Sequence, residues 1–136
     1  MKRTILFVVV ATLILSACSP TPNVDLGGKW KLISYGDAVN PIPALPNVDT
    51  TIQFENGQVS GNLGCNGFGG EYKLKGDKII FGSLVSTMMY CEETSVQEQG
   101  VLTVFADGVE LTLSMNGNAL SIASPDGKSV VNIARK

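Results

Sequence analysis

Histidine is absent from the sequence, and this absence removes the commonest metal ligand and general base from the available chemistry. It excludes nucleophilic schemes of the Ser–His and Cys–His type and most zinc chemistry. The chain also has no long block of like charges and no low-complexity region, so its length fits one domain with one core. We therefore expect no catalytic residue, no metal site and no cofactor.

A long hydrophobic span is missing as well. Residues 5–14, apolar except for Thr12, are too few to cross a membrane, because a spanning helix needs roughly 20 apolar residues. They follow Lys2 and Arg3 and precede small residues, an order typical of a secretory signal peptide. The segment Leu15-Ser16-Ala17-Cys18 resembles the bacterial lipobox, in which the Cys is diacylated, the preceding segment is removed and the new amino group is acylated.

This pattern predicts three parts: residues 1–17 as a lipoprotein signal peptide, residues 18–25 as a short tether and residues 26–136 as the folded domain. Lipidation of Cys18 would attach the chain to a membrane, because more than one acyl chain gives stable anchoring. Ser19 stands where an Asp would favour retention at the inner membrane. We therefore predict a lipid-anchored protein of the cell envelope, at the outer membrane and facing the periplasm.

A basic surface is also lacking. Loss of Lys2 and Arg3 with the signal peptide leaves 8 basic residues against 12 acidic ones, a net charge of −4. Proteins that bind nucleic acid present a basic stripe or patch. We therefore expect no nucleic-acid partner.

The rest of the chain is dominated by apolar residues with a period of two, which indicates antiparallel strands. The predicted strands include residues 30–32, 52–54, 72–74, 79–81, 111–115, 120–122 and 130–133, and the turns between them include 55–57, 75–77, 116–117 and 125–127. Residues 40–46 contain three prolines and are expected to form a loop. The sequence thus predicts a mainly β fold that curls into a small barrel or sandwich.

One segment departs from the β pattern. Ser95 and Glu98 fit a helix capping box, and Gly108 lies where a helix would stop. Gly100 weakens this helix by about 1 kcal/mol relative to Ala. The sequence therefore predicts one short helix that is stabilised by packing on the sheet.

Two short groups of residues carry a resemblance. The first is Gly64, Cys65, Asn66 and Phe68, the second is Thr87, Met89 and Cys91, and Gly28, Trp30 and Leu32 precede both. Together they resemble the META domain, also called the HslJ-like family. The resemblance implies a compact lipocalin-like β-barrel with a packed helix, found in bacterial envelope proteins that are often lipoproteins. It also implies a link to heat shock and novobiocin resistance, with no assigned catalytic activity.

The chain departs from the family at two positions. Family members often carry Arg after Gly-Cys-Asn and between the Thr and Met of the second group, whereas this chain has Gly67 and Met88. The resemblance therefore carries no anion-binding role over to these positions.

Two cysteines are left once Cys18 is lipidated, and a secreted chain tends to pair such thiols. We predict a structural disulfide between Cys65 and Cys91. The alternative is a soft Cu(I) site in which Met88 and Met89 join the two thiolates. If the disulfide forms, one Met is expected to fill the core and the other to cover it.

Three further features have a structural and a functional interpretation. The glycine-rich residues 61–70 invite comparison with phosphate-binding loops, but a strand follows them, so we expect their glycines to serve close backbone approach. Glu92 and Glu93 are expected to be a solvated helix lead-in rather than a catalytic pair. Trp30 is expected to pack in the core rather than to contact a ligand.

No pattern in the sequence identifies a reaction. Our prediction is therefore a membrane-anchored envelope lipoprotein that acts without catalysis, through contact with another envelope protein, in stress or antibiotic tolerance. The alternative is a barrel that binds a small apolar ligand such as an antibiotic or a lipid. The abundance of large apolar residues in a short chain favours a filled interior, and with it the first of these.

Overall fold

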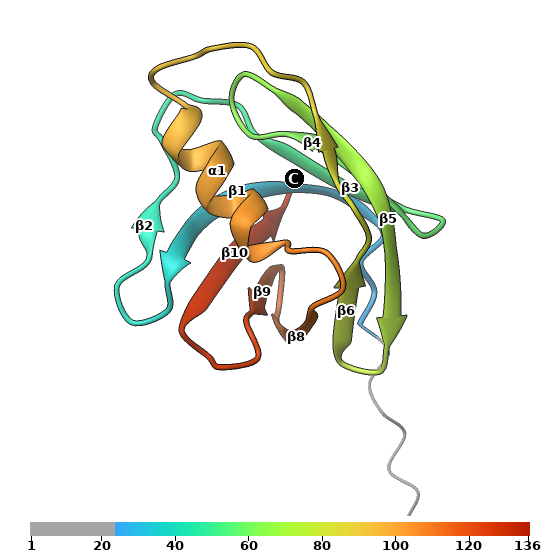
Figure 1. Ribbon diagram of the computed structural model, residues 1–136. Coiled ribbons are helices and arrows are strands. Elements are labelled where there is room, and N and C mark those ends of the chain that lie inside the picture. The colour runs from blue at the N-terminus through green and yellow to red at the C-terminus, as the bar shows by residue number, and fades with distance from the viewer. Residues whose placement is uncertain (1–23) are drawn as a thin grey trace, which may run out of the picture.

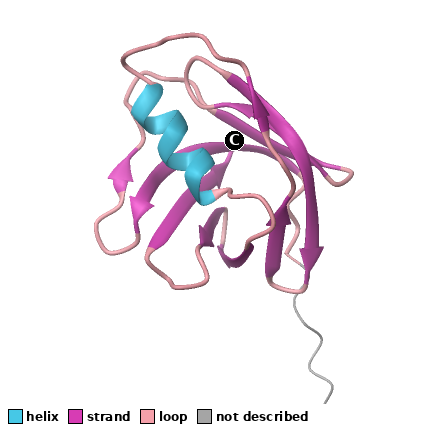
Figure 2. Cartoon of the chain, in the orientation of Figure 1, coloured by secondary structure: helices cyan, strands magenta, loops and turns pink. Residues whose placement is uncertain are grey.

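The computed structural model describes residues 24–136, so the predicted signal peptide and most of the predicted tether, with Cys18, lie outside the described residues. Ten strands and one helix make up the described part of the chain (Figures 1 and 2). The elements are β1 (Gly28–Asp37), β2 (Ile42–Pro43), β3 (Thr51–Glu55), β4 (Gln58–Asn62), β5 (Gly67–Lys75), β6 (Lys78–Phe81), β7 (Val85–Ser86), α1 (Ser95–Val104), β8 (Glu110–Asn116), β9 (Ala119–Ala123) and β10 (Ser129–Arg135). The prediction of a mainly β fold with one short helix is confirmed. No helix among residues 24–136 is long and apolar enough to cross a membrane.

The strands form a single sheet that closes into a ring. Its order is β10-β9-β8-β6-β5-β4-β3-β1-β2, and β1 also pairs with β10, which joins the two sides. All strand pairings are antiparallel, and most link neighbours in sequence through short turns, as the period-two pattern predicts. The ring is less regular than a barrel, because β6 and β8 pair over only the three residues Lys78–Ile80 and β7 lies beside β5 alone. Helix α1 lies across one opening of the ring (Figure 1).

The interior of the ring is filled by large apolar side chains. Trp30, Phe54, Phe81 and Phe105 are all fully buried, and the rings of Phe81 and Phe105 stack at 4.5 Å between centroids. Burial alternates along β1 and β3, so one face of each strand points inward. The expected core position of Trp30 is confirmed.

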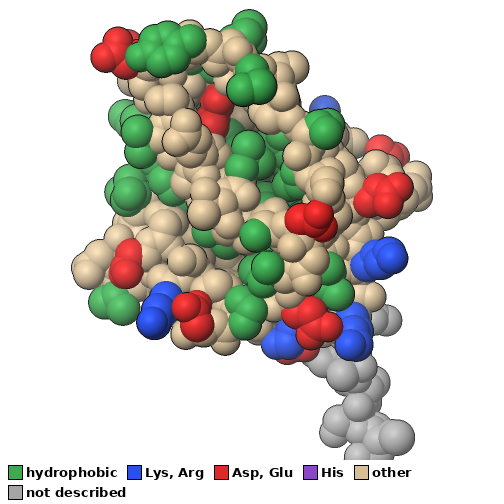
Figure 3. Space-filling view, viewed as in Figure 1, with side chains coloured by type: hydrophobic (Ala, Val, Ile, Leu, Met, Phe, Trp, Pro, Cys, Tyr) green, Lys and Arg blue, Asp and Glu red, His purple; other side chains and the backbone are tan. Residues whose placement is uncertain are grey.

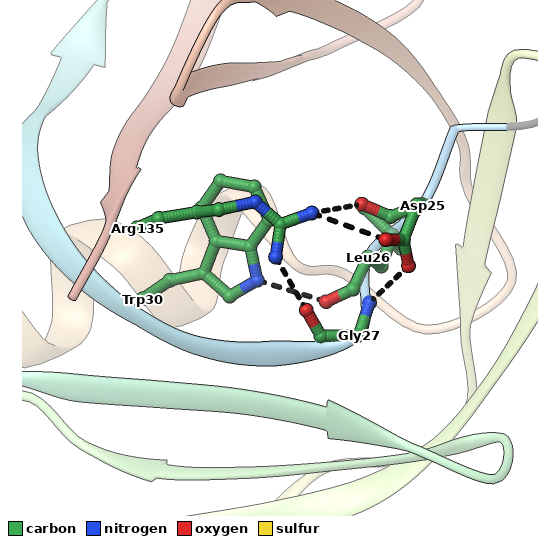
Figure 4. A network of polar contacts seen from close by, with 5 residues as sticks. All are labelled: Asp25, Leu26, Gly27, Trp30 and Arg135. Carbon is green, nitrogen blue, oxygen red and sulfur yellow. Dashed lines mark hydrogen bonds and ion pairs between the residues drawn. The ribbon is translucent and has the colours of Figure 1, made fainter.

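A polar network fixes the point where the described chain begins (Figure 4). Arg135 lies over the Trp30 ring at 4.5 Å from its centroid and donates hydrogen bonds to the backbone oxygens of Gly27 at 2.6 Å and Asp25 at 2.9 Å. Trp30 Nε1 donates to the Leu26 oxygen at 2.8 Å. The cation–π contact and these bonds tie residues 25–30 to the last strand. Residues 25–30 are thereby held against β10.

The segment with three prolines contains a short strand that the sequence did not predict. Ile42 and Pro43 pair with Tyr35 and Ser34 of β1. Because β2 has only this neighbour, it is an edge strand, where proline is tolerated.

The helix forms where predicted, but its ends differ. Thr94 occupies the N-cap position without a capping hydrogen bond from its side chain, and Ser95 Oγ donates to the Glu92 oxygen instead. The predicted capping box is therefore wrong, because Glu98 is engaged elsewhere. The helix ends at Val104, four residues before Gly108, which takes a positive φ of 72° in the turn that follows.

Gly100 supports the predicted packing of the helix on the sheet. A Cβ at this position would lie 2.5 Å from Cε2 of Tyr35 on β1, so only glycine allows this close contact. The propensity lost at Gly100 is offset by the burial of Val101, Val104 and Tyr35.

Candidate functional site

The two groups of family-motif residues meet beside the N-terminal half of α1. Cys65, in the loop after β4, and Cys91, in the loop before α1, form a disulfide. The disulfide joins the β4–β5 loop to the segment between β7 and the helix. Its formation removes both thiolates from the alternative copper site.

Asn66 binds the same segment through its side-chain amide. Its Oδ1 accepts hydrogen bonds from the Met89 N–H and the Thr87 hydroxyl, both at 2.8 Å, and its Nδ2 donates to the Met89 oxygen at 3.0 Å. Thr87 in turn donates its N–H to the Gly67 oxygen at 2.9 Å. The Asn66 amide thus pairs with Met89 as a neighbouring strand would, and holds residues 87–89 extended.

Glu98 on α1 is the anion at the centre of this arrangement. Its Oε1 accepts from the backbone N–H groups of Cys65 at 2.6 Å and Asn66 at 2.8 Å, and its Oε2 accepts from Asn66 Nδ2 at 2.8 Å. Thr94 Oγ1 adds a longer bond of 3.3 Å. Glu98 is buried, so the carboxylate ties the helix to the loop from within.

Burial raises the pKa of Glu98, but the hydrogen bonds from Asn66, Cys65 and Thr94 outweigh it, so the pKa lies below its ordinary value of 4.5. The group is therefore charged at neutral pH. Its acceptor oxygens are already occupied, which suits a structural anion better than a general base.

Gln97, the neighbour of Glu98, binds the β4–β5 loop at a second point and also binds the loop between β2 and β3. Its Nε2 donates to the Leu63 oxygen at 2.6 Å, and its Oε1 accepts from the Leu45 N–H at 2.8 Å. Gly64 lies in the β4–β5 loop between Leu63 and Cys65 and has a φ of 149°. A Cβ at this position would lie 2.6 Å from Thr94 Cγ2, so the loop approaches the start of α1 too closely for a side chain here. Consecutive side chains of α1 thus fix the loops around the opening of the ring.

Sequence reasoning missed the role of Glu98. The comparison of residues 61–70 with phosphate-binding loops was set aside, yet backbone N–H groups of this loop do bind an anion. That anion is the carboxylate of Glu98, which lies 32 residues from Asn66 in the chain. The signal in the sequence is the glycine-rich loop of residues 61–70 together with an acidic residue on the predicted helix.

A cleft of about 420 Å³ lies between residues 86–91 and α1. Its lining comprises Asn66, Ser86, Thr87, Met88, Met89, Tyr90, Cys91, Ser95, Glu98, Gln99 and Leu102. Met88 is 96% exposed and Met89 59% exposed, so the expectation that one fills the core and the other covers it is wrong. Glu92 and Glu93 are exposed, as predicted for a solvated lead-in.

A family model described as the META domain matches residues 23–136. The chain belongs to the META domain family. The predicted resemblance is therefore confirmed. In this META domain the two motif groups make one connected cluster, in which the disulfide, Asn66 and Glu98 join two loops to the helix.

Solved structures share the fold. A protein from Burkholderia xenovorans, solved by NMR, has a TM-score of 0.65 and 22% identity over 82% of this chain and 83% of that chain. A DUF4847 family protein from Bacteroides vulgatus ATCC 8482, solved by crystallography, has a TM-score of 0.60 and 13% identity over 82% of this chain and 94% of that chain. At these identities the likeness concerns the fold alone. No curated protein matches the chain.

Proposed function

We propose that this META domain protein is a non-enzymatic binding module of the bacterial cell envelope, anchored to the membrane through lipids on Cys18. In this proposal it contributes to stress or antibiotic tolerance by contacting another envelope protein at the cleft between residues 86–91 and α1. The observation that carries the proposal is the exposed apolar rim of that cleft.

Apolar side chains gather at this rim on a rigid support. Met88 is 96% exposed, Tyr90 86% and Met89 59%, and all three line the cleft. Val85 and Val96, also exposed, are the sequence neighbours of the lining residues Ser86 and Ser95. Figure 3 shows hydrophobic side chains at the upper end of the molecule, over the loop that leads into α1 in Figure 1. Exposed apolar patches of this kind mark interaction sites, and a surface held in one conformation binds with less loss of entropy.

The position of the cleft relative to the predicted anchor supports the same proposal. The described chain begins at Val24, at the lower end of Figure 1, whereas residues 87–94 cross the upper end. A lipid anchor on Cys18 would therefore join the folded domain at the end opposite the cleft. A partner in the aqueous compartment would then reach it without obstruction from the membrane.

Binding of a small apolar ligand is the second candidate, and the size of the cleft favours it. Ligand pockets typically measure about 300–1,000 Å³ and are lined mainly by apolar side chains, and this cleft, at about 420 Å³, includes Met88, Met89 and Leu102. The interior of the ring is filled, so a ligand would bind in the cleft rather than in the ring.

Complementation with the full-length chain tests the first proposal. In a strain that lacks the gene and shows reduced stress or antibiotic tolerance, Met88→Glu or Tyr90→Glu should leave the protein folded and membrane-bound but should fail to restore tolerance. The matched control is Leu74→Glu, at an exposed apolar residue near the far end of β5. Full restoration by both cleft variants would contradict the proposal. A saturable rise in melting temperature with one apolar compound, novobiocin included, would favour the second candidate.

A further inference from the structure

One wall of the cleft is a strand edge held in place from its other side. The register of β7 on β5 pairs Ser86 with Phe68 and Val85 with Gly69. The ladder continues past β7, where the Thr87 N–H donates to the Gly67 oxygen and the Asn66 amide pairs with Met89. Residues 85–89 are thus fixed as one extended segment.

The opposite edge of this segment is open. In an antiparallel ladder, alternate residues direct their backbone N–H and C=O groups to opposite sides. Thr87 and Met89 are bonded toward β5, so the backbone groups of Ser86 and Met88 point away from β5, and both residues line the cleft. Among residues 24–136, β7 pairs with β5 alone, and the N–H groups of Ser86 and Met88 donate no hydrogen bond. The wall of the ring is therefore open to a further strand at this place.

The charge of the cleft is negative. The hydrogen-bond donors to Glu98 are all neutral groups, and no residue that lines the cleft is a Lys or an Arg. Glu92 and Glu93 add two exposed carboxylates next to the lining residue Cys91. None of these three acids takes part in an ion pair within the described residues. A ligand with basic side chains is the electrostatic complement of this surface.

We propose that the open edge of residues 86–88 binds an extended segment of a partner protein by β-strand addition, and that this segment combines apolar side chains with Lys or Arg. This inference rests on the proposed function and specifies its partner. The backbone of the segment pairs with Ser86 and Met88, its apolar side chains contact Met88, Met89 and Leu102, and its basic side chains face the glutamates. The flexible Met side chains adapt to different apolar residues.

Other occupants fit these features less well. A helix would leave the N–H groups of Ser86 and Met88 without partners, because its own backbone bonds are internal. A second copy of the chain, paired edge to edge, would bring two sets of Glu92 and Glu93 together. An anionic lipid surface would be repelled by the same carboxylates.

Peptide selection followed by NMR tests the inference. The soluble chain of residues 19–136 is suitable, because its core lies within the described residues. The probe is a library of random linear peptides on phage, followed by a synthetic peptide of the enriched sequence. We expect enriched sequences with alternating apolar residues, at least one Lys or Arg and no central Pro. The synthetic peptide should slow amide exchange at Ser86 and Met88 by about tenfold or more, and leave Thr87 and Met89 unchanged because they are already bonded.

Two control peptides leave the protein itself unaltered. Methylation of the central backbone nitrogens should abolish binding, because these groups form the added ladder. Exchange of Lys or Arg for Glu should weaken binding by about tenfold or more. The inference would be overturned if either control peptide bound as well as the original, or if the peptide protected amides at another strand edge. It would also be overturned if the library gave acidic peptides or no enriched peptide, or if the protein associated with itself through residues 86–88. If these results occur while Met88→Glu and Tyr90→Glu still fail to restore tolerance, the proposed function stands and the partner's chemistry is different.

Discussion

Replacing Glu98 with Gln should lower the free energy of unfolding at pH 7 by about 2–4 kcal/mol, because the change keeps the shape of the side chain and removes its charge. The Cys65 and Asn66 N–H groups, at 2.6 and 2.8 Å, would still meet an oxygen, but a neutral one. The Asn66 Nδ2, now 2.8 Å from Oε2, would face an amide nitrogen that cannot accept. Hydrogen bonds to charged groups contribute about 1.5–3 kcal/mol, against about 0.5–1.5 for neutral pairs.

Urea denaturation of the soluble chain measures this loss, and a melting curve should show a decrease of about 10 °C. The matched control is Glu93→Gln, which makes the same charge change at an exposed position. The pKa of Glu98 in the folded protein lies below its ordinary value of 4.5. The charged carboxylate therefore makes its full contribution to the free energy of unfolding at pH values above 4.5. This contribution is lost as the pH falls from 4.5 through the pKa of Glu98 in the folded protein. The difference between wild type and Glu98→Gln should therefore shrink in acid. If Glu98→Gln were as stable as Glu93→Gln at pH 7, the reasoning about this cluster would be refuted.

Three other changes have defined outcomes. Replacing Cys65 and Cys91 with Ser should lower the free energy of unfolding by about 3.5 kcal/mol, given a separation of 26 residues; thiol counting that finds two free thiols in the unreduced wild type would contradict this. Gly100→Ala should destabilise the fold by about 1–3 kcal/mol although Ala has the better helix propensity, because the added methyl group would collide with Tyr35. A variant that is more stable than the wild type in urea denaturation would contradict this prediction. Cys18→Ser should abolish membrane fractionation, and mass spectrometry of the mature N-terminus should find acylated Cys18 in the wild type.

The hairpins could be predicted from the sequence because each one is specified locally. The Asn56-Gly57 turn, for example, joins β3 and β4 with Glu55 opposite Gln58, and both turn residues have the positive φ that such a turn needs. The turn predicted at residues 116–117 lies one residue later, at Gly117 and Asn118, because Asn116 still pairs with Ala119. By contrast, β2 and β7 have two residues each and no periodicity of their own. They are strands only because a neighbour pairs with them.

The cluster around Glu98 could be predicted only in part. The family motif identified Cys65, Asn66 and Cys91. Glu98 matched the local pattern of a capping box, whereas its shortest hydrogen bonds come from Cys65 and Asn66, more than 30 residues away in the chain. The exposure of both Met88 and Met89 was also missed, since one of the two was expected to fill the core. An apolar residue in a segment without periodicity was assigned to the core, whereas Asn66 and the disulfide hold that segment outside it.

Site-specific cross-linking tests the central claim, that this domain acts by binding a protein at the cleft. A photoreactive residue is placed at position 88 or 90 of the full-length chain in cells, with position 74 as the control. The account predicts that one envelope protein is cross-linked from positions 88 and 90 and not from 74. It also predicts that this protein, once purified, binds the domain with a Kd that Tyr90→Glu raises by about tenfold or more. Cross-linking at 88 and 90 no stronger than at 74, or a Kd that Tyr90→Glu leaves unchanged, would contradict the account.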